Sequence, residues 1–367
     1  MSSSKSFSIL GKNLKANTKA DLEPYLSELV SMHDVEEVHF GGNSLGVEAC
    51  QAIAEVLKAK AKLTVGSLAI LTAAIPLISG QLVDLADIFT GRLISEIPQA
   101  LSALCDALQS HTSLVEVDLS DNAFGGRCAD ALVPFLRNNT SFQVFKLNNN
   151  GLGVWGGTVV SKALLDNARK CKEEGRESSL KVVVCGRNRL ENGSASHWAE
   201  AFAAHSGLVE VRLPQNGIRM EGIAALAEGL SKCPIIEVLD LQDNTATKTG
   251  TRSIVKHLTA WPELRVLNLS DCLLGSAGGI ALATSLNLGS NPKLEELRLQ
   301  YGEFDKRTVE SLSTAVAQHL KDLRVLELNG NRFGAEDECV EELRKALELH
   351  GHEDALDDCE CFLMPLP

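Results

Sequence analysis

The chain has 367 residues, of which 35 are Lys or Arg and 48 are Asp or Glu, giving a formal net charge of -13. This acidic balance disfavours a nucleic-acid or anionic-membrane binder that depends on counterion release, and it fits a partner with a basic surface. Hydrophobic residues make up 44% of the chain and aromatic residues 4%, so the core must consist mainly of Leu, Val, Ile and Ala, and disorder over most of the chain is excluded.

The N-terminal segment MSSSKSFSILGKNLKANTK contains no apolar run of the length that a secretory signal requires. The ten cysteines are scattered along the chain and form no CxxC pair, which argues against a zinc site and against a disulfide framework. Together these features predict a protein of a reducing compartment that holds no metal.

The first repeated unit is VEEVHFGGN, which begins at Val35 and follows the pattern LxxLxLxxN. The alternating apolar positions predict a short strand with one buried face. The ninth position carries an Asn, whose amide can satisfy backbone groups where the chain turns. Residues 47–60, which follow, have the apolar spacing of an amphipathic helix. Strand, turn and helix in one unit predict a long leucine-rich repeat.

Residues 63–83 carry no charge, and about 20 apolar residues are enough for a membrane span. Removing residues 65–81, however, joins Leu63 and Thr64 to Leu82 in the string LTLVDLADI, which restores the repeat pattern. Neither edge of the stretch carries the Lys/Arg cluster or the aromatic belt of a transmembrane helix. We therefore interpret residues 65–81 as an apolar insertion within a repeat and expect no membrane span.

Eight further units follow, the first of them starting at Leu114. Successive starts are separated by 28, 38, 28, 28, 28, 30 and 29 residues. The 38-residue interval contains the polar stretch 169–179 and predicts one longer loop. The ninth position is Asn in most units, but Cys272 and Gly302 replace it in two. The series predicts an α/β leucine-rich-repeat solenoid over residues 1–350, a horseshoe of 28-residue, ribonuclease-inhibitor-like repeats with strands on the concave face and helices on the convex face. Residues 351–367 are expected to form a short acidic, irregular tail.

The eighth position of each unit points away from the core of such a solenoid and is a candidate for partner contact. These residues are Asp87, Asp121, Asn149, Arg187, Gln215, Asp243, Asp271 and Tyr301. The fifth position adds Asp84, Asp118 and Asp240 beside Lys146, Arg212 and Arg298. This distribution predicts an acidic face with a basic patch in its middle; the alternative is an ordinary solvated face on an acidic protein. The chain has none of the motifs HExxH, GxxxxGK[ST] or GxSxG, so we expect no catalytic chemistry of its own.

Several segments are more specific than the repeat and resemble the Ran GTPase-activating proteins. They are DIFTGR from Asp87, LSDNAFG from Leu119, LNNNGLG from Leu147, CGRNRLENGS from Cys185 and LELNGNRF from Leu326. The resemblance covers most of residues 7–358 apart from the insertion. It implies a short, single-domain protein that accelerates GTP hydrolysis by Ran in trans. Such a protein needs no cofactor, because the GTPase carries GTP and Mg²⁺.

The resemblance also implies roles for two residues. In that family the GTPase supplies a glutamine that orients the attacking water, and the activator places an asparagine against it; the matching residue is Asn149 in LNNNGLG. The repeat pattern agrees, because Asn150 fills the ninth position and leaves Asn149 at the outward eighth. Arg92, in DIFTGR, matches an arginine that matters in the family, where it orients the partner rather than acting as an arginine finger. Without the resemblance, Asn149 is a solvated turn amide and Arg92 an ordinary loop arginine.

The expected partner is therefore Ran in its GTP form, with or without a Ran-binding protein, and no nucleic acid is involved. A monomer that supports nucleocytoplasmic transport, located in the cytoplasm or at the nuclear envelope, fits this partner. The alternative is a non-catalytic leucine-rich-repeat binding module, either ribonuclease-inhibitor-like or a scaffold, that uses the acidic concave face. Such a module would need neither DIFTGR nor LNNNGLG.

Overall fold

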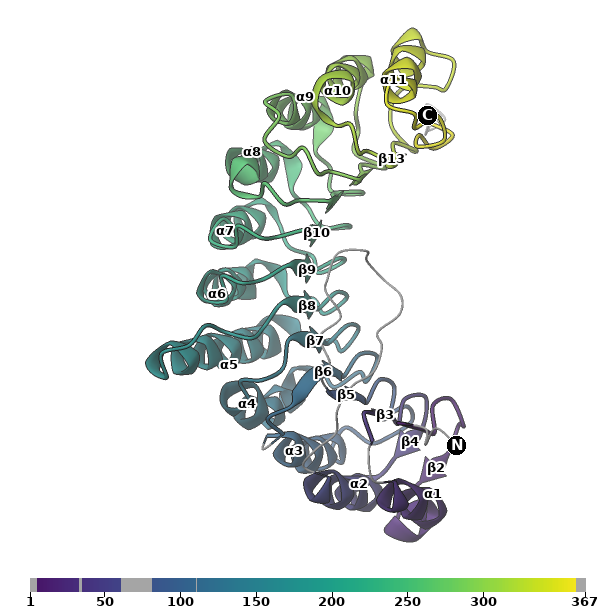
Figure 1. Cartoon of the computed structure of the whole chain (residues 1–367), viewed down its shortest axis with the longest axis vertical. Coiled ribbons are helices and arrows are strands. Elements are labelled where there is room, and N and C mark those ends of the chain that lie inside the picture. Colours follow the sequence, from purple (N-terminus) through teal and green to yellow (C-terminus); the bar gives the residue numbers. More distant parts are fainter. Residues whose placement is uncertain (1–4, 33–34, 61–80, 110, 361–367) are drawn as a thin grey trace. The chain divides into compact units, whose positions relative to one another are not determined.

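The structure is a computed structural model that describes residues 5–32, 35–60, 81–109 and 111–360. The chain forms two compact units, residues 1–188 and 189–367, and both are built from the predicted sequence of strand, turn and helix (Figure 1). The boundary follows Asn188, a ninth-position residue, so it divides a continuous repeat series. The interpretation of residues 65–81 as an insertion lies outside the described residues except for Gln81, where strand β5 begins.

Unit 1 contains a parallel sheet whose strands pair in chain order. Its strands are β1 (Ser6–Ser8), β3 (Glu37–His39), β5 (Gln81–Asp84), β6 (Leu114–Asp118), β7 (Val144–Lys146) and β8 (Val182–Val184). A small second sheet pairs β2 (Lys15–Ala16) with β4 (Ser44–Leu45). The helices are α1 (Lys19–Ser31), α2 (Val47–Ala59), α3 (Ile97–Leu108), the short η1 (Gly126–Cys128), α4 (Ala129–Asn138) and α5 (Gly153–Glu173).

Unit 2 repeats the arrangement with a second run of parallel strands. They are β9 (Glu210–Arg212), β10 (Val238–Asp240), β11 (Val266–Asn268), β12 (Glu296–Arg298) and β13 (Val325–Glu327). Its helices are α6 (Glu191–Ala204), α7 (Met220–Leu230), α8 (Thr247–His257), the short η2 (Leu258–Ala260), α9 (Gly275–Leu286), α10 (Lys306–His319) and α11 (Glu338–Glu348). In both units the helices lie on one side of the strands (Figure 1).

The core of each unit lies between the strands and the helices. Val117 and Leu119, from the alternating positions of one repeat, are 0% and 1% exposed, and Leu132 and Leu136 of α4 are fully buried. Each such side chain contributes roughly 1.5–3 kcal/mol by leaving water. The alternation that the sequence predicted therefore places one face of each strand in the core, and the other face carries polar side chains. The chain thus folds as a leucine-rich-repeat solenoid.

The prediction of a longer loop at residues 169–179 is wrong in part. Helix α5 continues to Glu173, and it ends at Gly175, whose φ of 72° suits a left-handed C-terminal cap. The amides of Gly175 and Arg176 close that cap on the carbonyls of Lys172 and Cys171, both at 3.0 Å. Residues 169–173 of the predicted loop therefore belong to a helix, and residues 174–179 do not. No helix in the part of the chain that the structure describes, α5 included, is long and apolar enough to cross a membrane.

The described residues that follow α11 pair with the last strand. Leu326 donates its amide to the carbonyl of Ala355 at 2.7 Å, and the Asp357 carboxylate accepts from the amides of Leu328 and Asn329 at 2.8 and 2.9 Å. These bonds satisfy donors that a terminal strand would otherwise leave unpaired. Residues 355–360 therefore cap β13, and the remainder of the expected irregular tail, 361–367, lies outside the described residues.

Candidate functional site at the turns of unit 1

A ladder of ninth-position asparagines lies buried behind the turns of unit 1. The Asn150 amide donates to the carbonyls of Leu119, Leu147 and Asn148 at 2.9, 3.2 and 3.0 Å. Its Oδ1 accepts the amide of Asn122 at 3.1 Å. Because Leu119 and Asn122 belong to the preceding repeat, these bonds join neighbouring turns, as the sequence pattern predicted.

Unit 2 interrupts this ladder twice. The Cys272 thiol donates to the carbonyl of Leu241 at 3.1 Å and so keeps one of the bonds that an amide would make. At Gly302 the ring of Phe304 fills the slot, since a Cβ on this glycine would lie 2.9 Å from the ring. The sequence correctly identified both replacements, and the structure shows that an aromatic ring replaces the amide at the second.

Every non-glycine residue at the eighth position adopts a left-handed backbone conformation. The φ values lie between 49° and 60° at Asp87, Asp121, Asn149, Arg187, Gln215, Asp243, Asp271 and Tyr301. This conformation costs most residues about 1–2 kcal/mol, and Asp and Asn tolerate it best. The geometry of the turn therefore accounts for part of the acidic column. It does not account for Arg187, Gln215 or Tyr301.

The backbone around Asn149 is held by hydrogen bonds from the repeats on both sides. Asn149 donates its amide to the carbonyl of Gly186 at 2.9 Å, and Asp121 donates its amide to the carbonyl of Asn148 at 2.9 Å. The Asn148 side chain adds a bond from the amide of Gly186 at 2.6 Å. The Asn149 side chain itself is exposed. The turn thus presents an exposed amide on a fixed backbone.

The Asn149 amide is oriented by its neighbour in the preceding repeat. Its Nδ2 donates to Oδ1 of Asp121 at 2.9 Å. Sequence reasoning placed both residues in the outward column but did not pair them. The stacking of equivalent positions in adjacent repeats was the signal that could have paired them.

The other predicted catalytic residue, Arg92, points toward the N-terminal repeats. Its guanidinium donates to the side-chain oxygen of Asn17, to the carbonyl of Ala16 at 2.9 Å and to the carbonyl of Ser44. Asn17 follows β2, and Ser44 lies in β4. Arg92 therefore ties the loop after β5 to the small second sheet, and it does not share a hydrogen-bonded cluster with Asn149.

The remaining predicted contact residues divide between the two units. In unit 1, Arg187 is exposed, and the Asp87 carboxylate accepts the hydroxyl of Thr90 within its own loop. In unit 2, Gln215 is exposed, and Tyr301 is 48% exposed with its ring over Gly330.

Asp243 and Asp271 occupy neighbouring turns of unit 2. Partial burial, followed by the charge of Asp243, raises the pKa of Asp271. The structure thus brings together two eighth-position pairs, Asp121 with Asn149 and Asp243 with Asp271.

The strand face of unit 1 carries a cluster of carboxylates. His39 lies between Asp84 and Glu37, at 3.3 and 3.4 Å from their oxygens, and the hydrogen bond to Asp84 is the main cause that raises its pKa. Burial raises the pKa of Asp118. Lys146 forms an ion pair with Glu116 at 2.5 Å. Among the described residues, no group of three or more His, Cys, Asp or Glu side chains is arranged to bind a metal ion.

On the strand face of unit 2, arginines form ion pairs with neighbouring carboxylates. Arg212 contacts Glu210 and, at 3.6 Å, Asp240, whose pKa is raised by burial. Arg298 contacts Glu296 at 2.8 Å and Glu327 at 3.4 Å. Both arginines of the predicted basic patch are therefore in ion pairs. Sequence reasoning missed Glu210 and Glu296 because they lie at the third position, and it listed fifth-position residues without including Glu327.

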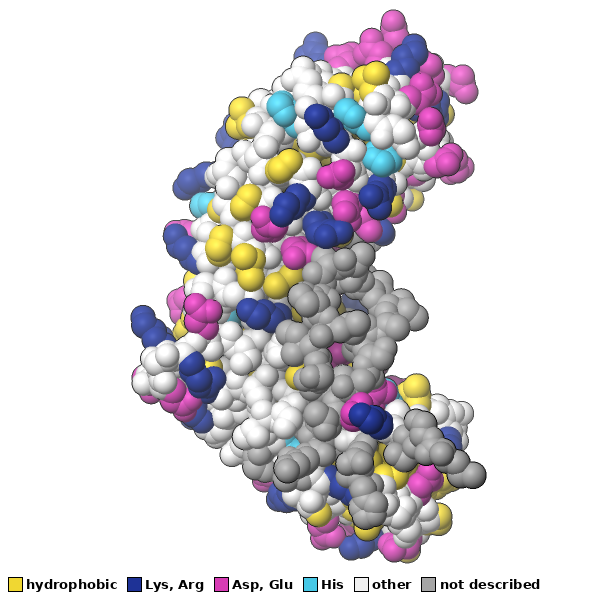
Figure 2. Space-filling model, in the orientation of Figure 1, with side chains coloured by type: hydrophobic (Ala, Val, Ile, Leu, Met, Phe, Trp, Pro, Cys, Tyr) yellow, Lys and Arg dark blue, Asp and Glu magenta, His cyan; other side chains and the backbone are white. Residues whose placement is uncertain are grey.

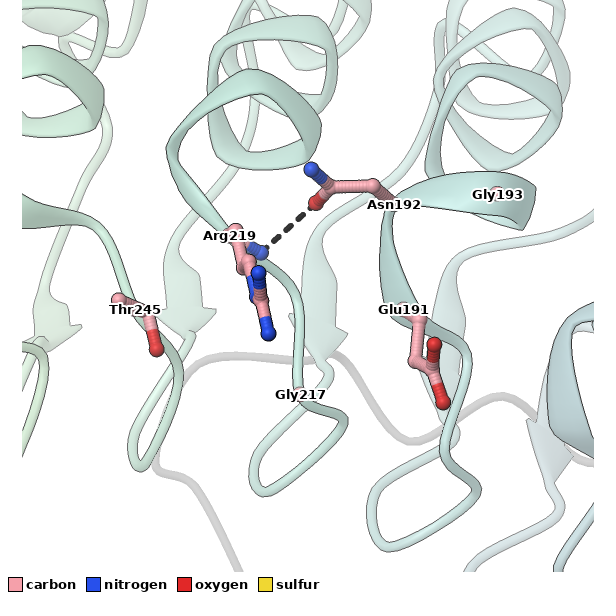
Figure 3. A pocket seen from close by; sticks show the side chains of 6 residues that line it. All are labelled: Glu191, Asn192, Gly193, Gly217, Arg219 and Thr245. Carbon is pink, nitrogen blue, oxygen red and sulfur yellow. Dashed lines mark hydrogen bonds between the residues drawn. The ribbon is translucent and has the colours of Figure 1, made fainter.

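An open groove of about 570 Å³ lies between the turns and the helix starts of unit 2 (Figure 3). It is lined by Glu191, Asn192, Gly193, Gly217, Arg219 and Thr245. Asn192 organises it by accepting the amide of Arg219 at 2.7 Å and donating to Glu221 at 2.8 Å. The groove contains part of CGRNRLENGS, so that segment shapes a surface in addition to supplying a ladder asparagine.

Acidic side chains gather around α11 at the C-terminal end of unit 2 (Figure 2). The exposed residues there include Glu336, Glu338, Glu341 and Glu342. A concentration of like charge attracts a partner of opposite charge over distances of about 8 Å at physiological salt. This end of the chain therefore fits a basic surface.

Comparison with known proteins gives the fold and the family. A family model described as "Leucine Rich repeat" matches residues 263–283. The chain is 35% identical over 347 residues to "Ran GTPase-activating protein 1" of Saccharomyces cerevisiae, covering 93% of this chain and 82% of that protein.

Two animal relatives are longer than this chain. The chain is 34% identical over 356 residues to "Ran GTPase-activating protein" of Drosophila melanogaster, covering 94% of this chain and 56% of that protein. It is 41% identical over 214 residues to "Ran GTPase-activating protein 1" of Xenopus laevis, covering 58% and 34%. The identity to the yeast protein extends over most of both chains, and this chain therefore belongs to the Ran GTPase-activating protein family.

Proposed function

We propose that this chain is a GTPase-activating protein for Ran and that Asn149 is its residue at the reaction centre. The observation that supports this proposal best is the exposed Asn149 amide on a backbone fixed from both sides. An amide in this setting can bind the carboxamide of the GTPase's own catalytic glutamine. The proposal assigns GTP and Mg²⁺ to the GTPase, so this chain needs no cofactor.

The size of the effect constrains the mechanism. A GTPase activator of the Ras type accelerates hydrolysis roughly 10⁵-fold, which corresponds to about 7 kcal/mol of barrier. One amide hydrogen bond contributes about 0.5–1.5 kcal/mol net. Most of the acceleration must therefore come from ordering the partner's glutamine and excluding water around it. A turn held by neighbouring repeats suits that task, because little of its freedom remains to be lost on binding.

Arg92 acts in this proposal as a positioning residue. Its guanidinium already donates to three acceptors of this chain, in residues 16, 17 and 44. To act as an arginine finger it would have to give up these bonds before reaching the transferred phosphoryl group. Arg92 instead holds the loop that carries Asp87, and Asp87 belongs to the surface that meets the GTPase.

Eighth-position side chains of each unit supply recognition. We assign contact with Ran-GTP to Asp87, Asp121, Arg187, Gln215, Asp243, Asp271 and Tyr301, and the four carboxylates among them would meet a basic face of the GTPase. Complementary charge increases the association rate, and this increase weakens as salt rises. The chain acts as a monomer in the cytoplasm or at the nuclear envelope, with or without a Ran-binding protein on the GTPase, and it supports nucleocytoplasmic transport.

Single-turnover GTP hydrolysis by Ran tests the proposal. The chain should accelerate hydrolysis by several orders of magnitude, and Asn149→Ala should remove most of that acceleration while the protein stays folded. A form lacking residues 65–81 should be at least as active, because the repeat pattern closes across that deletion. Replacement of Asn149 without effect in an active protein would show that the assignment of this residue is wrong.

The same protein preparation distinguishes a GTPase activator from the alternative, a non-catalytic binding module. A ribonuclease-inhibitor-like module would block a basic ribonuclease, would leave GTP hydrolysis at its intrinsic rate, and would be indifferent to Asn149→Ala. Trp155, in the first turn of α5 in unit 1, gives a binding readout because it is exposed, whereas the other two tryptophans, Trp198 and Trp261, are fully buried. In a 5-fluorotryptophan sample the Trp155 resonance should respond when Ran-GTP is added.

A further inference from the structure

We propose that Asp121 is a positioning residue that fixes which end of the Asn149 amide faces the GTPase. This inference rests on the proposed function and adds a second residue to its site. It is carried by the hydrogen bond from Asn149 Nδ2 to Asp121 Oδ1, at 2.9 Å.

The chemistry of the pair determines its orientation. An ionised carboxylate only accepts hydrogen bonds, whereas an amide has an NH₂ donor at one end and a carbonyl acceptor at the other. Asn149 must therefore turn its NH₂ toward Asp121. Its Oδ1 is then left for the exposed side of the turn, where a partner would arrive.

The backbone keeps the two side chains at this distance. Both residues hold the eighth position of adjacent repeats, with φ of 60° at Asp121 and 53° at Asn149. The Asp121 amide bonds to the carbonyl of Asn148, and the Asn149 amide bonds to the carbonyl of Gly186. Both side chains are short, so the fixed backbones leave them few alternative arrangements.

The orientation matters because the partner's glutamine is also an amide. A glutamine that orients the attacking water needs its carbonyl oxygen for that water. If Asn149 presents Oδ1, it accepts from the glutamine NH₂ and leaves the glutamine carbonyl for the water. If Asn149 presented its NH₂ instead, it would compete for that carbonyl. Asp121 thus favours the productive arrangement before the partner binds.

The aspartates at three other eighth positions have different neighbours. Asp243 and Asp271 stand in neighbouring turns of unit 2, but two ionised carboxylates have no donor to share. The Asp87 carboxylate bonds to Thr90 of its own loop.

Two substitutions of Asp121 separate orientation from charge. Asp121→Gly removes the carboxylate, and glycine tolerates the left-handed backbone without strain. Asp121→Asn removes the charge but keeps an oxygen that can accept from Asn149, and asparagine also tolerates this backbone. In single-turnover hydrolysis by Ran-GTP, we expect Asp121→Gly to lower the maximal rate at least tenfold while the half-saturating concentration changes less than threefold. Asp121→Asn should restore the maximal rate to within about threefold of the unsubstituted chain.

Asp322→Gly is the matched control, because Asp322 is an exposed carboxylate in the turn before β13 and outside the proposed contact surface. It should leave both kinetic parameters unchanged. If Asp121→Asn and Asp121→Gly are equally impaired, or if the loss lies in the half-saturating concentration and varies with salt, then charge steering explains Asp121 and the inference is overturned. A fully active Asp121→Gly protein overturns the inference and leaves the proposed function intact. If the unsubstituted chain fails to accelerate hydrolysis, the proposed function fails and this inference fails with it.

The free protein gives a readout independent of Ran. In a ¹⁵N-labelled sample of the free protein, the Asn149 side-chain NH₂ signals should lie at different chemical shifts in the unsubstituted chain and in Asp121→Gly, because the substitution removes their acceptor. Asn149 NH₂ chemical shifts that are the same in the unsubstituted chain and in Asp121→Gly would contradict the proposed orientation of the amide. This measurement distinguishes a wrong geometry from a wrong partner.

Discussion

The eighth-position turns of the two units have the same backbone conformation, but they differ in which group lies opposite each side chain. In unit 1 the Asp121 carboxylate faces the Asn149 amide, an acceptor beside a donor. In unit 2 partial burial raises the pKa of Asp271, and the charge of Asp243 in the neighbouring turn raises it further. The φ values of these four residues differ by only a few degrees, from 53° to 60°. One turn geometry therefore gives an oriented amide in one unit and a repulsive pair in the other.

The ladder behind the turns shows the same contrast. Behind the candidate site, Asn122, Asn150 and Asn188 succeed one another and hydrogen-bond across repeats. In unit 2, Asn216, Asn244 and Asn331 keep the slot, but two repeats fill it with a thiol at Cys272 and with the aromatic ring of Phe304 at Gly302. Hydrogen bonds thus fix the turn where the proposed function requires a fixed amide.

The largest expected difference is in stability, between replacing a ladder amide of unit 1 and replacing the ladder thiol of unit 2. Asn150→Ala leaves buried carbonyls and the amide of Asn122 without their partner, and should lower the free energy of unfolding by about 3 kcal/mol. Cys272→Ala removes a single weak thiol donor and should cost about 1 kcal/mol. Urea denaturation with unchanged slope measures both. Equal losses would show that the thiol at Cys272 holds its turn as strongly as the amide at Asn150 holds its own.

The next effect tests the aromatic replacement. Gly302→Asn restores the repeat pattern in the sequence, yet its Cβ would lie 2.9 Å from the fully buried ring of Phe304. The ring would have to move, and stability should fall by about 1–3 kcal/mol. Gly334→Ala is the control, because its Cβ would meet no atom within 4 Å. A more stable Gly302→Asn protein would mean that the slot still accepts an amide.

The smallest effect concerns the repulsive pair of unit 2. The pKa of Asp271 is raised in the folded state, so the folded protein binds this proton more tightly than the unfolded chain. Ionisation of Asp271 therefore lowers stability as pH rises through the folded pKa. Asp271→Asn should stabilise the protein at pH 7 by roughly 0.3 kcal/mol, discounted for exposure, and the gain should disappear at pH values below the ordinary 3.8. Stability curves against pH for both proteins measure this; a gain independent of pH would assign it to another cause.

The repeat period predicted the strands, the turns and the ladder because each repeat buries the same positions. It did not predict that residues 169–173 continue α5, since an interval counts residues without giving their conformation. The repeat period also did not predict which residues the Arg92 side chain contacts. That side chain binds residues beside β2 and β4, and these two-residue strands are too short to leave a pattern in the sequence.

The pairing of Asp121 with Asn149 was within reach of the sequence. Equivalent positions in adjacent repeats stack at the strand spacing of about 4.8 Å, so a carboxylate and an amide at successive eighth positions can meet. Comparing the hydrogen-bond donors and acceptors of successive eighth-position side chains would have identified the pair. The ion pairs of Arg212 and Arg298 required the third position of each strand to be included as well.

A double-mutant cycle across the complex tests the central claim most directly. Single-turnover hydrolysis would be measured for Ran and for Ran with its catalytic glutamine replaced by alanine, each with the unsubstituted chain and with Asn149→Ala. If Asn149 acts through that glutamine, Asn149→Ala should slow the unsubstituted GTPase strongly and should have almost no effect once the glutamine is gone. Two effects that multiply independently would contradict contact between Asn149 and the glutamine.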